Sequence, residues 1–269
     1  MPELPEVEIV RRGIEKKLLG QRITRVDVLD SRINRRSSSD FAADLRGQIL
    51  RKIHRQGKWL FITLDSTDVC IVHLRMSGQL IINSKPIEHP SLRILIFLSQ
   101  NVISYIDQRR FGEMFVLDRV EAISFMDRLG VDALTLTPAE LRKALTGRVG
   151  SLKAALCNQA LVAGIGNIYS DEALWRAQLR WDRKAGSLSE AEIQNLTKEI
   201  KQVLRHALKA GGTSAKDGLY VNTDGRIGWF AQKLAVYQRE DSPCLKCGTL
   251  VQRKKLSSSS TYFCPRCQK

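Results

Sequence analysis

The chain has 269 residues, of which 43% are hydrophobic and only 7 are proline. It is therefore long enough to bury two hydrophobic cores, and its composition excludes a generally disordered protein. Lys and Arg total 43 against 28 Asp and Glu, which gives a formal net charge of +15. A polyanion is the expected partner, because each phosphate that a cation neutralises releases counterions. Nucleic acid is the first candidate, and an anionic membrane surface is the second. A basic protein without such a partner is the alternative.

The start of the chain shows no secretory signal. Its first residues are acidic, and the longest purely apolar run is the short stretch at 94–98. We therefore expect a cytosolic protein that does not associate with a membrane.

A helix is predicted near the N-terminus. Apolar side chains recur there at helical spacing, at Val7, Val10, Ile14 and Leu18. Pro5 suits the first turn of this helix, and Gly20 suits its end. Glu6 and Glu8 would lie in the first turn, where the helix dipole favours negative charge. Helix formation does not account for the residues that precede it.

Short β-rich runs with turn-rich separators follow, from residue 23 to about residue 117. The runs are ITRVDVLD, KWLFITLD, VCIVHL, GQLIIN, LRILIFL, NVISYID and EMFVLD. Their close spacing predicts an antiparallel β-sandwich.

Helical patterns return after Asp132. Thr137 and Glu140 form a capping-box pattern, and residues 151–158 predict a short helix. Asn167 is the expected N-cap of the helix NIYSDEALWRAQ. A longer helix is predicted from about residue 189 to residue 210, where two glycines end it.

The C-terminal region carries a metal-binding pattern. Its spacing is C-x2-C-x16-C-x2-C, formed by Cys244, Cys247, Cys264 and Cys267. This spacing is typical of a four-thiolate zinc site, and two unconnected thiol pairs are the alternative. Because four protein ligands leave no open position, we expect one structural Zn²⁺ that stiffens a β-hairpin. Arg253, Lys254 and Lys255 make this hairpin a candidate phosphate-binding element. Cys70 and Cys157 remain as core thiols.

Pro2 becomes a terminal secondary amine if the initiator methionine is removed, as is usual before a small residue. An α-amine titrates about two units below a lysine side chain, so more of it is unprotonated at neutral pH. Such an amine can attack C1′ of deoxyribose to form an iminium, which acidifies the C2′ proton and allows loss of the 3′ phosphate. Glu3 is placed to protonate the sugar ring oxygen.

PELPEVE at the start, GNIYSDE in the middle and the paired CxxC at the end resemble the bacterial formamidopyrimidine-DNA glycosylase family, over essentially the whole chain. Leu4 favours this family over its endonuclease VIII relatives, which typically begin PEGPE. The resemblance implies a base-excision repair enzyme, both DNA glycosylase and AP lyase. Such an enzyme removes 8-oxoguanine and formamidopyrimidines from double-stranded DNA and nicks the strand by β- or β,δ-elimination. We expect it to act as a monomer.

The resemblance also implies roles for single residues. Pro2 is expected to be the Schiff-base nucleophile and Glu3 the proton donor, with Glu6 supporting the start of the first helix. Lys58, in QGKWLF, is expected to meet phosphate and assist β-elimination.

Met76, Arg109 and Phe111 resemble the trio that fills the void left by an extruded nucleotide. Phe111 can wedge between bases, Met76 is a pliable filler, and Arg109 can hydrogen-bond the widowed cytosine. Without the resemblance, Met76 and Phe111 would be expected in a hydrophobic core.

Further DNA-binding residues are implied at His89, Arg148, Lys153 and Asn167, in addition to Arg109. Asn167 is expected to contact a backbone phosphate at a helix N-terminus. The stretch GGTSAKDGLYVNTDG resembles the loop that closes over the flipped base.

The expected fold is α+β, in three parts. Residues 1–131 form an N-terminal catalytic β-sandwich flanked by the N-terminal helix. Residues 132–221 form a helical DNA-binding domain with a helix-two-turns-helix. Residues 222–269 contain the lesion-capping loop region and the C-terminal four-cysteine zinc-finger hairpin.

One position departs from the family pattern. The family typically has an arginine in R-x-T before the third cysteine, whereas this chain has Ser259, Ser260 and Thr261. A serine cannot replace a bidentate cation on phosphate. We therefore expect weaker DNA binding and accumulation of the β-elimination product, and Ser259 supports the alternative of a catalytically weakened DNA-binding paralogue. An endonuclease VIII-like glycosylase for oxidised pyrimidines is the other alternative.

Overall fold

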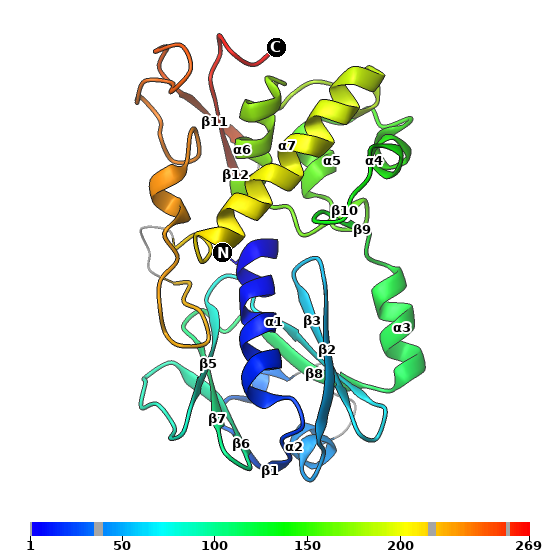
Figure 1. Ribbon diagram of the computed structural model, residues 1–269, viewed down its shortest axis with the longest axis vertical. Helices are drawn as coiled ribbons and strands as arrows, with labels where there is room; N and C mark the ends of the chain where they lie inside the picture. The colour runs from blue at the N-terminus through cyan, green and yellow to red at the C-terminus, as the bar shows by residue number, and fades with distance from the viewer. Residues whose placement is uncertain (1, 35–39, 215–218, 257–258) are drawn as a thin grey trace. The chain divides into compact units, whose positions relative to one another are not determined.

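The computed structural model in Figure 1 describes residues 2–34, 40–214, 219–256 and 259–269. Residues 215–218 of the predicted lesion-closing loop lie outside these ranges. The chain divides into two compact units, one formed by Met1–Arg128 and Ala210–Trp229, the other by Leu129–Lys209 and Phe230–Lys269. Each unit therefore contains two separate segments of the chain.

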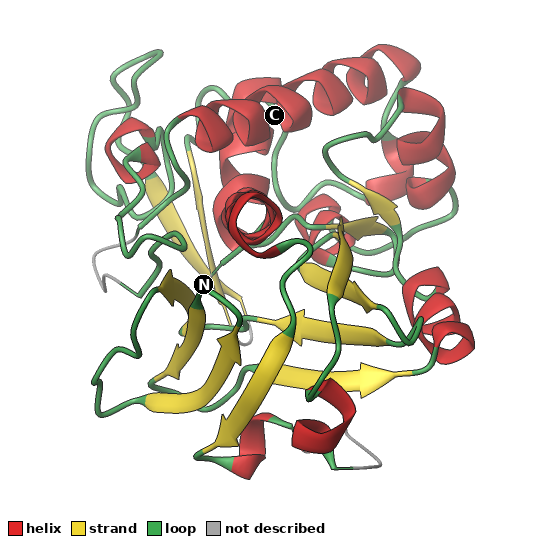
Figure 2. Ribbon diagram, turned by 60° about the horizontal axis from the view of Figure 1, so that its bottom comes forward, coloured by secondary structure: helices red, strands yellow, loops and turns green. Residues whose placement is uncertain are grey.

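The first unit is built on two four-stranded antiparallel sheets (Figure 2). One sheet has the order β1 (Ile23–Val28), β6 (Leu92–Leu98), β7 (Val102–Asp107) and β5 (Gly78–Asn83). The other has the order β2 (Leu50–Gln56), β3 (Trp59–Leu64), β4 (Val69–His73) and β8 (Glu113–Leu117). Side chains from both sheets share one hydrophobic core. The predicted antiparallel sandwich is confirmed.

Strand β2 was not among the predicted runs. Its sequence, LRKIHRQ, is rich in cations, and its buried apolar side chains, Leu50 and Ile53, lie three residues apart. The pairing with β3 is irregular between Leu50 and Lys52, so both apolar side chains turn inward despite the odd spacing. This irregularity removes the period-two alternation by which a strand is recognised in a sequence.

Helix α1 (Leu4–Leu18) fits the prediction and packs against β2, β3 and β5. The four apolar residues that predicted it, Val7, Val10, Ile14 and Leu18, are all buried in the core of the first unit. Burial of each such side chain contributes about 2 kcal/mol. Two shorter helices, α2 (Phe41–Leu45) and α3 (Arg119–Asp127), complete the unit with the 3-10 turn η1 (Ser31–Ile33).

The second unit is mainly helical, with α4 (Pro138–Leu145), α5 (Leu152–Cys157), α6 (Asn167–Ala177) and α7 (Glu190–Lys209). It also contains the short parallel pair β9 (Val131–Asp132) and β10 (Val162–Ala163), and the 3-10 turns η2 (Ala185–Ser187) and η3 (Phe230–Lys233). The predicted capping box of Thr137 and Glu140 is present at the start of α4. Strands β11 (Gln252–Leu256) and β12 (Ser259–Phe263) form the predicted antiparallel hairpin.

The prediction that Asn167 is the N-cap of α6 is wrong by one residue. Gly166 is the N-cap, with extended backbone at φ −133° and ψ −153°, and Asn167 is the first helical residue. A glycine adopts this cap conformation easily, and it shifts the helix start to the asparagine.

Across the described ranges, helices long and apolar enough to cross a membrane are absent.

Candidate active site and nucleic-acid interface

The N-terminal residues lie buried at the start of α1. Pro2, Glu3 and Glu6 are all buried. One carboxylate oxygen of Glu6 accepts a hydrogen bond from the backbone N–H of Glu3 at 2.8 Å, and the other accepts one from Thr213 at 2.8 Å. Glu6 therefore fixes the first turn of the helix to the 210–229 segment of the same unit. The start of α1 is therefore held in place by these hydrogen bonds and is not frayed.

Lys58 lies in the tight turn between β2 and β3, and only 6% of it is exposed. The preceding Gly57 has a positive φ of 59°, which a glycine adopts without strain. Arg55 donates to the Gly57 carbonyl at 2.9 Å and to the Glu8 carboxylate at 3.0 Å. The same guanidinium thus holds the turn that carries Lys58 and the helix that follows Pro2.

The Glu8 carboxylate is stabilised in its charged form. Burial acts to raise its pKa, but hydrogen bonds from Arg11, Arg12 and Arg55 outweigh burial and hold the pKa below its ordinary value. Glu8 is therefore a structural anion and not a proton donor.

Met76, Arg109 and Phe111 lie on two loops of the first unit, between β4 and β5 and between β7 and β8. Met76 is 36% exposed and Phe111 is 53% exposed, so neither is a core residue. A guanidinium nitrogen of Arg109 lies 3.0 Å from the sulfur of Met76. The structure therefore brings Arg109 and Met76 together at the surface. Phe111 is exposed on the loop that also carries Arg109, and large exposed apolar groups are available to a partner.

The candidate DNA-binding residues of the second unit differ in accessibility. Arg148 is exposed, and Asn167 is half-buried at the start of α6. Lys153 is only 2% exposed. Its ammonium donates to Asp171 at 2.7 Å and to the carbonyl of Ser260 at 3.0 Å, so it is enclosed between α6 and the zinc hairpin.

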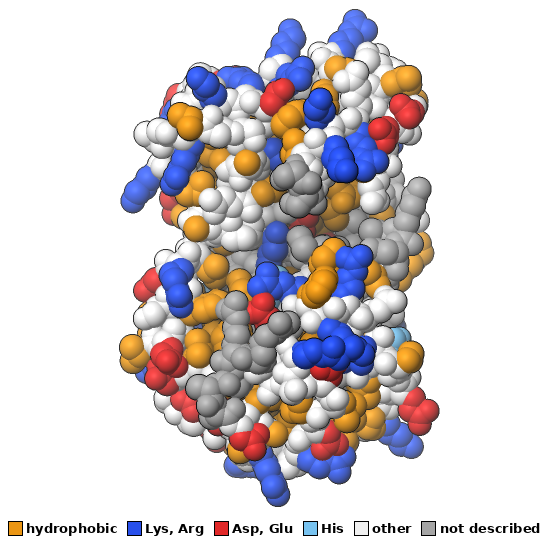
Figure 3. Space-filling view, turned by 180° about the vertical axis from the view of Figure 1, so that it is seen from behind, with side chains coloured by type: hydrophobic (Ala, Val, Ile, Leu, Met, Phe, Trp, Pro, Cys, Tyr) orange, Lys and Arg blue, Asp and Glu red, His pale blue; other side chains and the backbone are white. Residues whose placement is uncertain are grey.

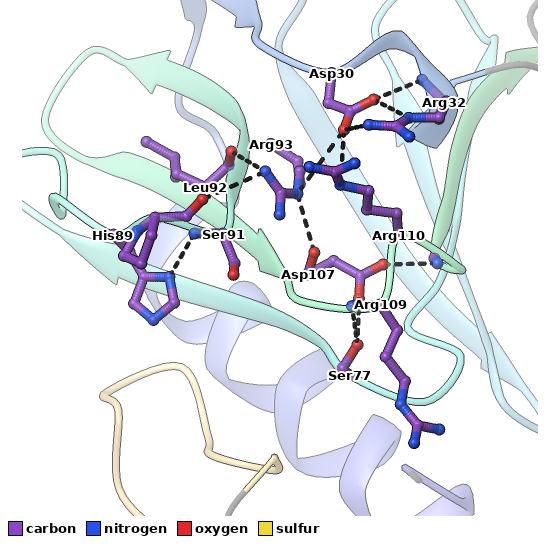
Figure 4. A network of polar contacts seen from close by, with 12 residues as sticks. Asp30, Arg32, Ser77, His89, Ser91, Leu92, Arg93, Asp107, Arg109 and Arg110 are labelled. Atoms are coloured by element: carbon purple, nitrogen blue, oxygen red, sulfur yellow. Dashed lines mark hydrogen bonds and ion pairs between the residues drawn. The ribbon is translucent and has the colours of Figure 1, made fainter.

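His89 lies on the exposed loop between β5 and β6 in the first unit. Its Nδ1 accepts a hydrogen bond from the backbone N–H of Ser91 at 2.9 Å (Figure 4). The acceptor role of Nδ1 leaves Nε2 as the ring nitrogen that can donate. Lys and Arg side chains are spread over the visible face of both units (Figure 3).

Two adjacent acids of α6 hold C-terminal segments in place. Asp171 accepts hydrogen bonds from the hydroxyl of Thr261 at 2.7 Å and the backbone N–H of Tyr262 at 2.9 Å, both on β12. Glu172 accepts backbone hydrogen bonds from three consecutive residues at 235–237. Burial raises the pKa of Asp171 to about 6, while the bonds from Lys153, Thr261 and Tyr262 act against that rise. The sequence motif marked this region, but not these partners.

The four C-terminal cysteines form one cluster. Their sulfurs all lie within 4.8 Å of one another, with Cys244 and Cys267 3.9 Å apart and Cys247 and Cys264 3.5 Å apart. A tetrahedron of Zn–S bonds of about 2.3 Å has sulfur–sulfur edges of about 3.8 Å. The cluster therefore fits a four-thiolate Zn²⁺. The indole N–H of Trp175 donates to the Cys244 sulfur at 3.4 Å, a hydrogen bond that stabilises a thiolate ligand.

Three domain families of known proteins match most of this chain. Residues 1–114 match the formamidopyrimidine-DNA glycosylase N-terminal domain, and residues 129–218 match the formamidopyrimidine-DNA glycosylase H2TH domain. Residues 241–269 match the zinc finger found in FPG and IleRS. The chain belongs to the formamidopyrimidine-DNA glycosylase family.

Formamidopyrimidine-DNA glycosylase from Thermobifida fusca is 40% identical, over 100% of this chain and 97% of the relative. The formamidopyrimidine-DNA glycosylase of Rhodococcus opacus is 39% identical over the same shares. The crystal structure of the MutM (Fpg) protein from Thermus thermophilus has a TM-score of 0.89 at 35% identity, covering 99% of this chain and 98% of that one. A complex of Lactococcus lactis Fpg with DNA containing an abasic site has a TM-score of 0.91 at 29% identity, covering 99% of both chains.

In this formamidopyrimidine-DNA glycosylase family member, Ser259 begins β12 opposite Leu256. The nearby Arg253 donates to the Ser260 hydroxyl at 3.0 Å and pairs with Glu240 at 3.5 Å. Arg253 is therefore engaged by Ser260 of the hairpin and by Glu240, which precedes the hairpin in the chain. Lys254 and Lys255 are exposed, and they are the cations of this hairpin that remain available for phosphate.

Proposed function

We propose that the chain is a bifunctional DNA glycosylase and AP lyase of base-excision repair. Its substrates would be 8-oxoguanine and formamidopyrimidines in double-stranded DNA. The observation that carries this proposal is the 40% identity across 97% of a formamidopyrimidine-DNA glycosylase. Related structures named MutM and Fpg are complexes with DNA containing carbocyclic 8-oxo-G and Fapy-dG. A bacterial enzyme with this substrate would act at the nucleoid, and one copy suffices for the proposed site.

Pro2 is the proposed nucleophile once the initiator methionine is removed. Its nitrogen forms a bond to C1′ while the bond from C1′ to the damaged base breaks, and the base leaves with a proton. The C1′–O4′ bond then breaks as the ring oxygen takes up a proton, and the iminium left between Pro2 and C1′ acidifies the C2′ proton. Loss of that proton expels the 3′ phosphate, and water then releases the enzyme.

Glu3 is the proposed proton donor to the sugar ring oxygen, and Glu6 holds the turn in which both catalytic residues lie. The hydrogen bonds of Glu6 to Glu3 and Thr213 support this division, because both of its oxygens accept from the backbone. Lys58 is the proposed cation for the departing phosphate. A point charge on a rigid turn suits that role.

Met76, Arg109 and Phe111 are proposed to fill the space left by the extruded nucleotide, and their exposure supports the proposal. His89, Arg148 and Asn167 are proposed phosphate contacts. Lys153 belongs to this set by resemblance. Because its ammonium is occupied by Asp171 and Ser260, we propose that it fixes the zinc hairpin and does not contact phosphate directly.

A catalytically weakened DNA-binding paralogue is a second candidate, favoured by Ser259. Single-turnover excision tests it: 8-oxoguanine opposite dC and thymine glycol opposite dA are placed in otherwise identical duplexes. We expect faster release of 8-oxoguanine. Faster release of thymine glycol would indicate an endonuclease VIII-like enzyme, and tight binding of both duplexes without release would indicate the paralogue.

A further inference from the structure

Asp107 links two loops of the first unit. These loops carry Met76, Arg109 and Phe111, and these three residues are called the wedge below. Asp107 is the last residue of β7 and pairs with Gly78, the first residue of β5. Met76 therefore lies just before one paired strand end, and Arg109 just after the other. The two loops leave the sheet from the same point.

The carboxylate of Asp107 is completely buried and accepts hydrogen bonds from both loops (Figure 4). One oxygen accepts from the hydroxyl of Ser77 and from the backbone N–H of Arg109 at 3.2 Å. The other accepts from the backbone N–H of Gly112 at 2.8 Å. The Ser77 hydroxyl oxygen in turn accepts from the Arg109 N–H at 2.9 Å. A single anion thus fixes the residue beside Met76 and both ends of the 109–112 stretch.

Close packing beneath the wedge leaves these loops little freedom. A Cβ atom added to Gly112 would lie 1.7 Å from the hydroxyl of Tyr105, and one added to Gly78 would lie 2.6 Å from the same hydroxyl. Gly112 in one loop and Gly78 directly after the other therefore both lie against the hydroxyl end of the buried Tyr105 side chain. Arg110, between the two wedge residues of its loop, has a positive φ of 59°. Its side chain pairs with Asp30 at 3.3 Å, which offsets the strain of that conformation.

We propose that Asp107 is a positioning residue for nucleotide extrusion: its carboxylate makes the two loops one rigid body, so that Met76, Arg109 and Phe111 enter the duplex together. This inference rests on the proposed function. A wedge must arrive with its shape already formed, because ordering two loops during insertion would reduce the gain from their contacts with DNA.

Asp107→Asn tests the inference with little change of volume. An amide can accept with only one of its two heavy atoms, so one loop loses its anchor. We expect excision of 8-oxoguanine from a duplex to slow by about ten- to a hundredfold, from the usual penalty for an unsatisfied buried group. Nicking of a duplex with a preformed abasic site should slow much less, since no damaged base has to be extruded from the helix. A general loss of structure would slow both reactions equally.

A fluorescence measurement separates wedge insertion from chemistry. 2-Aminopurine placed beside a tetrahydrofuran abasic analogue brightens when the wedge unstacks it. At saturating protein, we expect Asp107→Asn to reach less than half of the wild-type amplitude. This readout needs no catalysis, so a wild-type chain that brightens the probe but excises nothing would count against the proposed function alone.

Ser66 and Asp68 provide a matched control in the turn between β3 and β4, where the Ser66 hydroxyl donates to Asp68 at 3.1 Å. Asp68→Asn should change neither readout. If Asp107→Asn does not fold, Ser77→Ala tests the inference in its place. We expect this variant to excise 8-oxoguanine from the duplex about three- to tenfold more slowly than wild type. The inference would be overturned if the Asp107 variant kept both its 8-oxoguanine excision rate and its fluorescence amplitude within twofold of wild type. Equal slowing on the 8-oxoguanine and abasic duplexes would also overturn it.

Discussion

Arg55 binds the Glu8 carboxylate through its Nε at 3.0 Å, and both side chains are buried although the residues lie 47 positions apart. The same guanidinium reaches the carbonyl of Gly57, beside Lys58. This ion pair therefore connects the helix that begins at the proposed nucleophile with the turn that carries the proposed phosphate-binding lysine. Its loss should affect both the stability of the fold and the alignment of the proposed nucleophile with the proposed lysine.

Glu8→Gln should lower the free energy of unfolding by about 3 kcal/mol at pH 7, because it leaves Arg55 without its buried counterion. The folded-state pKa of Glu8 lies below the ordinary value of 4.5, so its stabilisation is present above that value and is lost as pH falls through the lower folded-state pKa. The difference between variant and wild type should therefore shrink below about pH 4.5. Urea denaturation of both proteins over a pH series measures this difference in the free energy of unfolding.

Glu15→Gln is the control for this prediction. Glu15 pairs with Arg11 at 2.9 Å on the same helix but is about half exposed. Exposed pairs contribute about 0.5 kcal/mol, so this variant should unfold almost as wild type does. Equal destabilisation by both variants would contradict the role given to the Arg55–Glu8 pair.

Removal of zinc should unfold the hairpin of β11 and β12 and weaken DNA binding. Four thiolates without their metal repel one another, and the small hairpin has little core of its own. Cys264→Ser should reduce the zinc content from one ion per chain to nearly none, as measured by a colorimetric chelator after digestion. Cys157→Ser, at a half-buried thiol outside the cluster, should leave the content at one. Retention of zinc by the Cys264 variant would refute the four-thiolate assignment.

Asp171→Asn should detach β12 from α6 while leaving zinc bound. The variant loses the charge that neutralises Lys153 and keeps only one acceptor for Thr261 and Tyr262, a cost of about 3 kcal/mol. Amide hydrogen exchange at 259–263 should accelerate by at least about tenfold. Asp182→Asn, which removes an exposed partner of Arg180, should not change it. Unchanged exchange in the Asp171 variant would show that the hairpin is held by other contacts.

Ser259→Arg should restore a phosphate contact at the start of β12. We expect tighter binding to an abasic duplex, a salt dependence steeper by about one unit of slope, and more β,δ-elimination product on a denaturing gel. Leu245→Arg adds the same charge at an exposed position of the first cysteine turn and should not shift the product ratio. Efficient β,δ-elimination by the wild type would show that Ser259 is no handicap.

Features encoded by local patterns could be predicted from the sequence. The helix α1 follows from apolar spacing, the capping box at Thr137 from four residues, and the zinc cluster from cysteine spacing. Strand β2 could not, because an irregular pairing breaks its alternation. Residues 210–229 belong to the first unit, and no local pattern in the sequence indicates that the chain returns there.

The residues that support the site were beyond prediction for a related reason. Asp107 and Ser77 lie 30 positions apart, and Asp171 and Thr261 lie 90 apart. An isolated acid in a sequence has many possible partners, and only the fold selects one. The resemblance identified residues proposed to meet DNA, whereas the carboxylates that position them emerged from the structure.

Borohydride trapping on an 8-oxoguanine duplex, followed by mass spectrometry of the N-terminal peptide, decides whether Pro2 is the nucleophile. We expect a chain that lacks Met1 and carries the reduced sugar adduct on the nitrogen of Pro2. A chain that retains Met1 and still cuts the damaged strand, or an adduct on a lysine, would contradict this assignment.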